Sequence, residues 1–210
     1  MFAIGRRELL LGVSALVLVG CGGAGGGGAG VSADDMVLGD ANAPVTLIEY
    51  ASTTCPHCAA FHEEAWEQLK TNYIDTGRVR FVFREYPTAP APIAVAGFQL
   101  ARCGGASSEQ YFARIGELFR QQRAMFATGS MEGVRQKLIE IGSATGLSQD
   151  QVMQCIADES GAERIRNTVE TANREFNVTG TPTFVINGTK YDGAPSYAGV
   201  SAALDRALAG

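Results

Sequence analysis

A long stretch without any strand pattern separates two groups of strand patterns in this chain. Before it, Val45–Tyr50 and Val79–Tyr86 are rich in β-branched and aromatic residues. The segment between these two strands has helical spacing and opens at Cys55-Pro56, which predicts a β–α–β unit with parallel strands. After the stretch, Thr183–Asn187 and Thr189–Tyr191 form a hairpin pattern around an Asn-Gly turn.

The intervening stretch, from Ile93 to about Phe176, contains helical patterns that glycines or small polar residues mostly separate. Each outer group is too small to bury a sheet alone. We therefore expect one α/β sheet with helices on both faces, and an all-helical segment inserted as a lid. The expected helices of the insertion are Ile93–Cys103, Ser108–Gln121, Met131–Ser143, Gln149–Asp158 and Ala162–Phe176, and Ser196–Leu208 closes the chain as a further helix.

The first residues indicate export rather than folding. Arg6 and Arg7 precede an apolar run, Leu9–Val19, that is too short for a typical membrane-spanning helix and ends in small residues. The two arginines resemble the start of a twin-arginine signal, although a Sec-type signal tolerates them. Leu18–Cys21 has the pattern of a lipobox, which predicts acylation of Cys21 and attachment to a membrane. An ordinary cleaved signal with a cysteine nearby is the alternative.

A run of glycine and alanine follows Cys21 and has almost no side chains to bury, which predicts a flexible tether. Folding is expected to begin near Val37. The predicted parts are an export signal over 1–20, a tether over 21–36, a sheet domain over 37–88 and 177–210, and a helical insertion over 89–176. The net charge is −5 and no basic run is present, so nucleic acid is not an expected partner. We expect a monomer.

Four cysteines remain when Cys21 is set aside, and an even number in an exported chain suggests paired thiols. Cys55 and Cys58 lie at a predicted helix start, where unpaired N–H groups and the helix dipole favour a thiolate at Cys55. Pro56 suits the first turn of that helix. A cationic His57 would stabilise the thiolate further, and this makes the disulfide more oxidising.

Two other interpretations of the Cys-X-X-Cys pair stay open. One is half of a zinc site, helped by His57 or His62, although Cys103 and Cys155 are isolated residues rather than a second ligand pair. The other is a structural disulfide, although so small a loop would constrain little of the unfolded chain. His62 is interpreted as a helix-surface residue. The aromatic residues interpreted as core are Trp66, Phe81 and Phe83.

The motif Cys55-Pro56-His57-Cys58, after a strand ending Glu49-Tyr50-Ala51-Ser52, resembles the DsbA-type thiol oxidases of the bacterial periplasm. The resemblance runs from about Val37 to the C-terminus and includes the helical insertion and the segment Val178–Phe184. It implies a thioredoxin-like fold and an enzyme that donates the Cys55–Cys58 disulfide to exported proteins through a mixed disulfide at Cys55. Neither a cofactor nor a metal is implied.

The same resemblance implies roles for three further residues. Pro182 matches a cis-proline that faces the active-site disulfide, and the Thr181 backbone beside it can pair with an extended substrate. Glu49 matches a buried acid beneath Cys58 that accepts the proton of this thiol. A trans proline at a strand start and a Glu49 exposed on an edge strand are the alternatives.

Cys103 and Cys155 match a second, non-catalytic disulfide, with two buried free thiols as the alternative. The implied partners are reduced or unfolded exported proteins and a quinone-linked membrane oxidase of the DsbB type. The expected location is the periplasm or cell envelope, with an anchor at Cys21. An envelope isomerase or reductase stays possible, although the tether leaves no room for the N-terminal oligomerisation domain usual in family isomerases. A metal-binding or redox-sensing lipoprotein is a third interpretation.

Overall fold

The computed structural model describes Met1 and residues 30–210. The predicted export signal, Cys21 and most of the predicted tether fall on residues 2–29 and lie outside the described residues. Within residues 30–210, no helix is both long enough and apolar enough to cross a membrane.

Strands from both ends of the chain form one sheet, in the order β1-β3-β2-β4-β5. The strands are β1 (Met36–Leu38), β2 (Val45–Ala51), β3 (Val79–Glu85), β4 (Thr183–Ile186) and β5 (Thr189–Tyr191). Strands β2 and β3 are parallel, as predicted, and the remaining pairs are antiparallel. The sequence does not predict β1, because three residues are too few to establish an alternating pattern.

Helices fill the long stretch between β3 and β4, and no strand interrupts them among the described residues, as predicted. The helical elements are α1 (Pro56–Glu64), α2 (Trp66–Leu69), the π-helical turn η1 (Lys70–Ile74), α3 (Ala91–Arg102), α4 (Ser108–Ala127), α5 (Met131–Ala144), α6 (Gln149–Ile156), α7 (Glu159–Phe176) and α8 (Tyr197–Ala209). Several predicted boundaries are wrong, and α4 continues to Ala127 past its predicted end at Gln121. Asp158 is not the end of α6 but the N-cap of α7, where its carboxylate accepts from the backbone N–H groups of Ser160 and Gly161.

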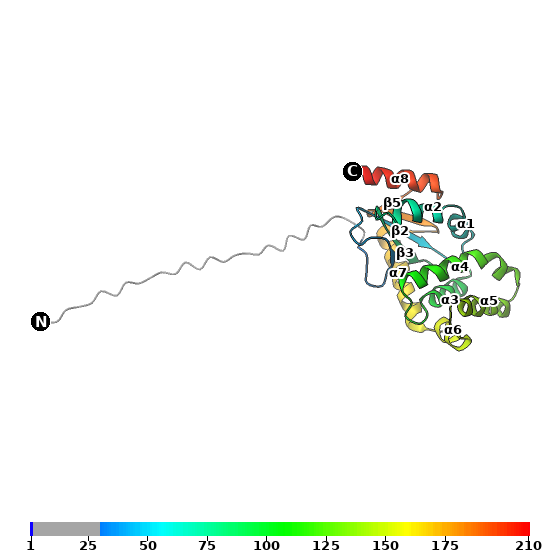
Figure 1. Cartoon of the computed structure of the whole chain (residues 1–210). Coiled ribbons are helices and arrows are strands. Elements are labelled where there is room, and N and C mark those ends of the chain that lie inside the picture. Colours follow the sequence, from blue (N-terminus) through cyan, green and yellow to red (C-terminus); the bar gives the residue numbers. More distant parts are fainter. Residues whose placement is uncertain (2–29) are drawn as a thin grey trace.

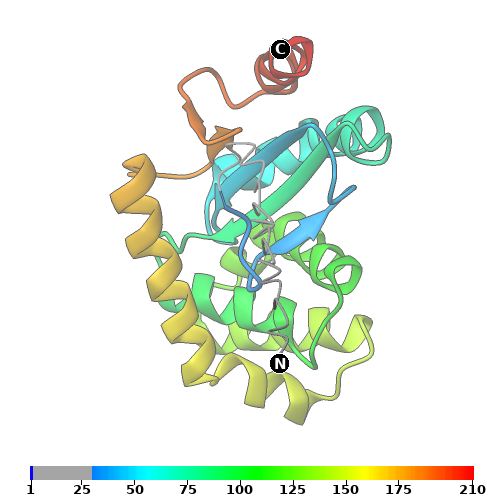
Figure 2. The same cartoon turned by 90° about the vertical axis from the view of Figure 1, so that its left-hand side faces the viewer.

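The side chains of β2 alternate between two apolar cores. Leu47 and Ala51 face a large core shared with α1, α2, α4 and α8, whereas Ile48 and Tyr50 face a smaller core against α7. The sheet therefore has helices on both faces, as the sequence predicts. Figure 2 shows α7, in yellow to orange, running along the flank of the sheet, while α3 to α6 form a separate group below. In Figure 1 the labels place α1 and α2 beside the sheet and α4 between α1 and α3.

Helix α7 is part of the predicted insertion in sequence but covers the sheet in space. Its Ala172 is fully buried against the same core as Tyr50. Helices α3 to α6 form a body at one side of the sheet and share its large core, and α7 returns the chain from that body to β4.

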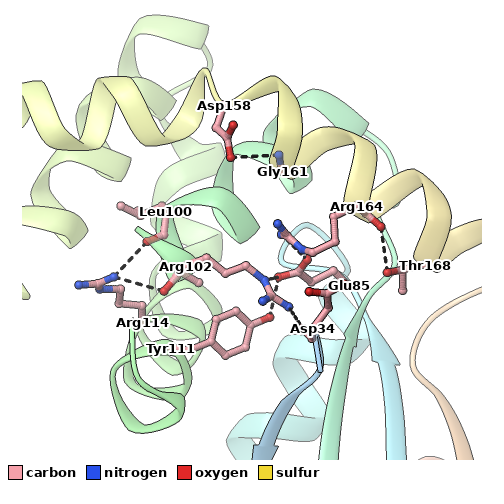
Figure 3. A network of polar contacts seen from close by, with 11 residues as sticks. Asp34, Glu85, Leu100, Arg102, Tyr111, Arg114, Asp158, Gly161, Arg164 and Thr168 are labelled. Atoms are coloured by element: carbon pink, nitrogen blue, oxygen red, sulfur yellow. Dashed lines mark hydrogen bonds and ion pairs between the residues drawn. The ribbon is translucent and has the colours of Figure 1, made fainter. Parts of the chain in front are cut away.

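A buried carboxylate at the end of β3 ties the helical body to the sheet (Figure 3). The side chain of Glu85 is 2% exposed and accepts hydrogen bonds from Arg102 Nε at 2.7 Å and from an Arg164 guanidinium nitrogen at 2.9 Å. The Tyr111 hydroxyl donates to the same carboxylate at 3.1 Å. These three partners come from α3, α7 and α4, so one residue holds three helices at one strand end.

Arg84, which precedes Glu85 on β3, holds the segment before β1 against the sheet. Arg84 donates to both carboxylate oxygens of Asp35, at 3.0 and 2.9 Å, to the Tyr50 hydroxyl and to the carbonyl of Gly30. Gly30 and Asp35 fall within the range that the sequence assigns to the tether. The composition of this segment does not predict the Asp35–Arg84 ion pair, because Arg84 lies far away in sequence, on β3.

Replacing Glu85 with alanine should therefore leave two arginines at a largely buried position with no counter-ion. We expect the free energy of unfolding to fall by about 3 kcal/mol or more, measured by urea denaturation. Glu117→Ala is the matched control, because it removes an exposed helix-surface pair with Arg120 and should cost less than about 1 kcal/mol. Equal losses in the two variants would contradict the bridging role of Glu85.

Candidate active site

Cys55 and Cys58 lie at the first turn of α1, in two different environments. Cys55 is the N-cap residue, with extended backbone, and its sulfur accepts a hydrogen bond from the backbone N–H of Cys58 at 3.4 Å. Pro56 occupies the first position of the helix, where no N–H is needed. Both cysteines are free thiols, and Cys55 is 6% exposed while Cys58 is fully buried. Of the two cysteines, only Cys55 has any exposure to solvent.

The loop before α1 is held by the helical body. The side-chain amide of Gln122, on α4, donates to the carbonyl oxygens of Thr53 and Cys55, at 2.8 and 3.0 Å. The Thr53 hydroxyl donates to the carbonyl of Ala94 on α3 at 3.3 Å, and Gly97 has no room for a side chain beside Thr53. The backbone of the Cys55 loop is thus fixed from two helices of the insertion.

Sequence reasoning missed Gln122, although its position offers a signal. It is a buried polar residue on the apolar stripe of α4, in line with Leu118 and Met125. A polar side chain at such a core position needs a hydrogen-bond partner, and here the partner is the active-site loop.

Thr181 lies directly against Cys55, although the two residues are 126 positions apart in sequence, and Pro182 follows Thr181. The Thr181–Pro182 peptide bond is cis. The Cys55 thiol donates to the carbonyl of Thr181 at 3.2 Å, and the Thr181 hydroxyl is buried with no hydrogen-bond partner among the described residues. The segment between α7 and β4 thus forms the wall opposite α1.

These contacts give the two thiols opposite acidities. The pKa of Cys55 is lowered to about 5, first by a hydrogen bond from the Cys58 thiol, and further by Thr181 and by the backbone N–H groups of Cys58 and His57. Burial opposes this shift but does not cancel it. The pKa of Cys58 is raised far above its usual value by burial, by its hydrogen bond to Cys55 and by the charge of Glu49. Near neutral pH, Cys55 is therefore a thiolate and Cys58 a thiol.

Glu49 lies fully buried on β2, on the sheet face that α1 covers. Its carboxylate oxygens are 2.9 and 3.2 Å from Nε2 of His62. The interpretation of His62 as a helix-surface residue is wrong, because its side chain is only 6% exposed and points at this buried acid. The sequence gives no direct sign of the pair, since helix and strand approach each other only in the folded chain.

His57 is the predicted site residue that the structure leaves outside this cluster of contacts. Its side chain is exposed, and among residues 30–210 its imidazole forms no hydrogen bond or ion pair. The backbone N–H of His57 does act on Cys55, but the effect of a cationic imidazole there stays a prediction.

Cys103 and Cys155 form a disulfide within the helical body, with their Cα atoms 5.5 Å apart. The bond joins the end of α3 to α6, and its sulfurs are therefore not available as zinc ligands beside Cys55 and Cys58. A non-catalytic role for this bond stays a prediction.

Comparison with known proteins places the fold and the motif in one family. The sequence model of the family described as Thioredoxin matches residues 32–206. A Rickettsia felis protein named as a protein-disulfide oxidoreductase is 35% identical over 179 residues, which cover 85% of this chain and 62% of that protein. The chain thus spans less than two thirds of this relative.

Solved structures agree with the sequence matches. The α-DsbA1 protein of Wolbachia pipientis superposes with a TM-score of 0.75 and 27% identity, covering 85% of this chain and 93% of that one. Oxidised BdbD of Bacillus subtilis superposes with a TM-score of 0.70 and 20% identity, covering 84% and 94%, which shows a common fold. The chain belongs to the thioredoxin family and, within it, to the DsbA type.

Proposed function

We propose that the protein is a thiol–disulfide oxidoreductase that donates its Cys55–Cys58 disulfide to reduced proteins in the cell envelope. The observation that supports this most directly is the opposite acidity of the two thiols. A stabilised Cys55 thiolate stabilises the reduced form of the pair, so the disulfide form is a stronger oxidant. The same asymmetry makes Cys55 the better leaving group in exchange.

The proposed reaction begins with a substrate thiolate that attacks the Cys55 sulfur of the disulfide. The Cys55–Cys58 bond breaks, a mixed disulfide forms at Cys55, and Cys58 leaves and becomes a thiol. A second substrate thiolate then attacks the mixed disulfide at the substrate sulfur and releases Cys55 as a thiolate. The substrate gains a disulfide, and the two electrons stay on the Cys55–Cys58 pair.

Three neighbours support these steps. The backbone of Thr181, beside the cis peptide bond to Pro182, is close enough to Cys55 to pair with an extended substrate. The Thr181 hydroxyl and two backbone N–H groups stabilise the Cys55 thiolate as it leaves. Glu49 exchanges the proton of Cys58, and its charge acts on this thiol.

The proposed partners and location follow from the sequence and the family. Substrates are reduced or unfolded exported proteins, and a quinone-linked membrane oxidase of the DsbB type restores the disulfide. The predicted export signal and lipobox support a location in the envelope, with attachment to a membrane through a lipid on Cys21. The nearness of Thr181 to Cys55 supports recognition of an extended peptide rather than of a folded surface.

The direction of electron flow is tested by equilibrating the purified protein with glutathione buffers. We expect a reduction potential near about −120 mV, typical of DsbA-type oxidases, because the Cys55 thiolate stabilises the reduced form. Cys55→Ser should abolish oxidation of a reduced peptide. A potential near about −270 mV, typical of a thioredoxin, would favour a reductase and contradict the proposal.

The acidity of Cys55 is tested by the pH dependence of its alkylation with iodoacetamide in the reduced protein. Because the pKa of Cys55 is about 5, the rate should rise to half its maximum near pH 5 and stay level above pH 7. The stabilisation of the reduced form should be lost as the pH falls through about 5.

Two variants identify the cause of that acidity. Cys58→Ala should raise the alkylation midpoint most, because the Cys58 thiol makes the largest contribution, and Thr181→Val should raise it less. A wild-type midpoint near the ordinary thiol value of about 8.5 would contradict the contacts described for Cys55.

Attachment through Cys21 is tested by cell fractionation and radioactive palmitate labelling of the full chain. The wild-type protein should incorporate label and remain with membranes, whereas Cys21→Ala should lose the label and appear in the soluble envelope fraction. Unlabelled wild-type protein would show that the lipobox pattern is misleading. Alkylation of Cys55 provides the control, since the site should be unchanged.

A further inference from the structure

Glu49 and His62 form an ion pair on the buried side of Cys58. His62 Nε2 lies 2.9 and 3.2 Å from the two carboxylate oxygens. His62 follows Cys58 by four residues on α1, so the two side chains lie on the same helix face. The charge of Glu49 acts on Cys58 directly. The pair is therefore next to the sulfur whose protonation changes when the disulfide opens.

Aromatic rings enclose the imidazole of His62 on its other sides. The ring stacks on Trp66 of α2 with centroids 5.1 Å apart, and it contacts Phe119 of α4 at 4.4 Å and Phe83 of β3 at 6.3 Å. None of these rings carries a charge. Among the described residues, Glu49 is the one acidic side chain that forms an ion pair with His62.

Because uncharged rings enclose His62, the charges of His62 and Glu49 have to balance each other. A buried charge without a partner is costly, so a negative charge on Glu49 and a positive charge on His62 favour each other, and the face of Trp66 also favours a cation. A thiolate formed at fully buried Cys58 would add a second negative charge beside Glu49. A proton on His62 Nε2, one hydrogen bond away from Glu49, can neutralise this charge.

We propose that His62 is a positioning residue that acts through Glu49 and stores the proton that Cys58 takes up and returns in each redox cycle. This inference rests on the proposed thiol–disulfide function. It extends that function by naming the source of the proton, which the buried carboxylate alone does not supply.

The proton transfer between Cys58, Glu49 and His62 balances both when the disulfide opens and when it forms again. When a substrate thiolate breaks the Cys55–Cys58 bond, Cys58 leaves as a thiolate. The Glu49 carboxylate takes the proton from His62 Nε2 and passes one to this sulfur, so the imidazolium becomes an imidazole and Glu49 is again a carboxylate. When the oxidising partner forms a mixed disulfide at Cys55, Cys58 attacks that sulfur, the partner leaves as a thiolate, and the Cys58 proton returns through Glu49 to His62.

The single tryptophan of the chain provides a direct signal for this transfer. Trp66 stacks on His62 with an interplanar angle of 24°, and an imidazolium quenches the fluorescence of an indole in contact with it. We would titrate Trp66 fluorescence with pH in the disulfide and dithiol forms of the whole protein. The midpoint should lie at lower pH in the dithiol form, because Cys58 then holds the stored proton.

His62→Gln and Phe119→Leu are the matched variants. The first keeps an N–H donor for Glu49 but cannot carry the proton, so the pH step in fluorescence should disappear in both forms. The second opens the aromatic enclosure but keeps the ion pair, so the redox-dependent difference in midpoint should remain. Identical midpoints in the two redox forms of the wild-type protein would overturn the inference without any variant.

Single-turnover oxidation of a reduced peptide gives the kinetic test. His62→Gln should slow it roughly tenfold, a modest share of what general acid–base catalysis supplies. Glu49→Gln should slow it comparably, and the double variant should be no slower than the slower single one, because the two residues act in one relay. Wild-type rates in folded His62→Gln would overturn the inference.

A wild-type protein that cannot oxidise the peptide at all would instead overturn the proposed function. The two failures are distinguishable, because the fluorescence midpoints report the position of the proton whether or not the peptide is a substrate.

Discussion

The contact between the Cys55 sulfur and Thr181 joins two parts of the chain that lie 126 residues apart, and the rest of the fold makes this contact possible. Strands β2 and β4 must be neighbours, with Glu49 opposite Phe184, for the end of one strand to meet the loop before the other. The chain between them leaves the sheet after β3, builds the helical body and returns along α7. The acidity of Cys55 is thus a property of the tertiary fold rather than of the Cys-X-X-Cys motif alone, because Thr181 reaches the sulfur only in that fold.

The sequence predicts those features that depend on local pattern. The β-branched residues of β2 and β3, the Asn-Gly turn before β5 and the spacing of the helices all reflect neighbours within a few residues, and these elements are found as expected. Features that depend on distant partners are missed. The ion pair of Arg84 with Asp35 joins β3 to the segment before β1, and Gln122 reaches the active-site loop from α4. His62 shows the same limit, because its partner Glu49 is on a strand and its enclosing rings come from three elements.

Three buried charges around the sheet are each met by a partner from another part of the chain. Glu85 is shared by arginines of α3 and α7, Arg84 is met by Asp35, and Glu49 by His62. Such pairs contribute little net stability once desolvation is counted, but removing one member leaves a buried charge and is costly. The pairs of Glu85 and Arg84 hold helices and the first segment on the sheet. The pair of Glu49 lies beside the reactive thiols and is the one that we assign to the chemistry.

The slight exposure of Cys55 bears on whether a substrate meets this sulfur before or after it folds. Helices α3 and α4 fix the loop of Cys55 from one side, Thr181 closes the other, and Glu85 holds the helical body to the sheet. The backbone around Cys55 is thus held from both sides. In the function that we propose, this fixed surrounding favours substrate cysteines on a stretch of chain that is still free to extend over those in a compact domain.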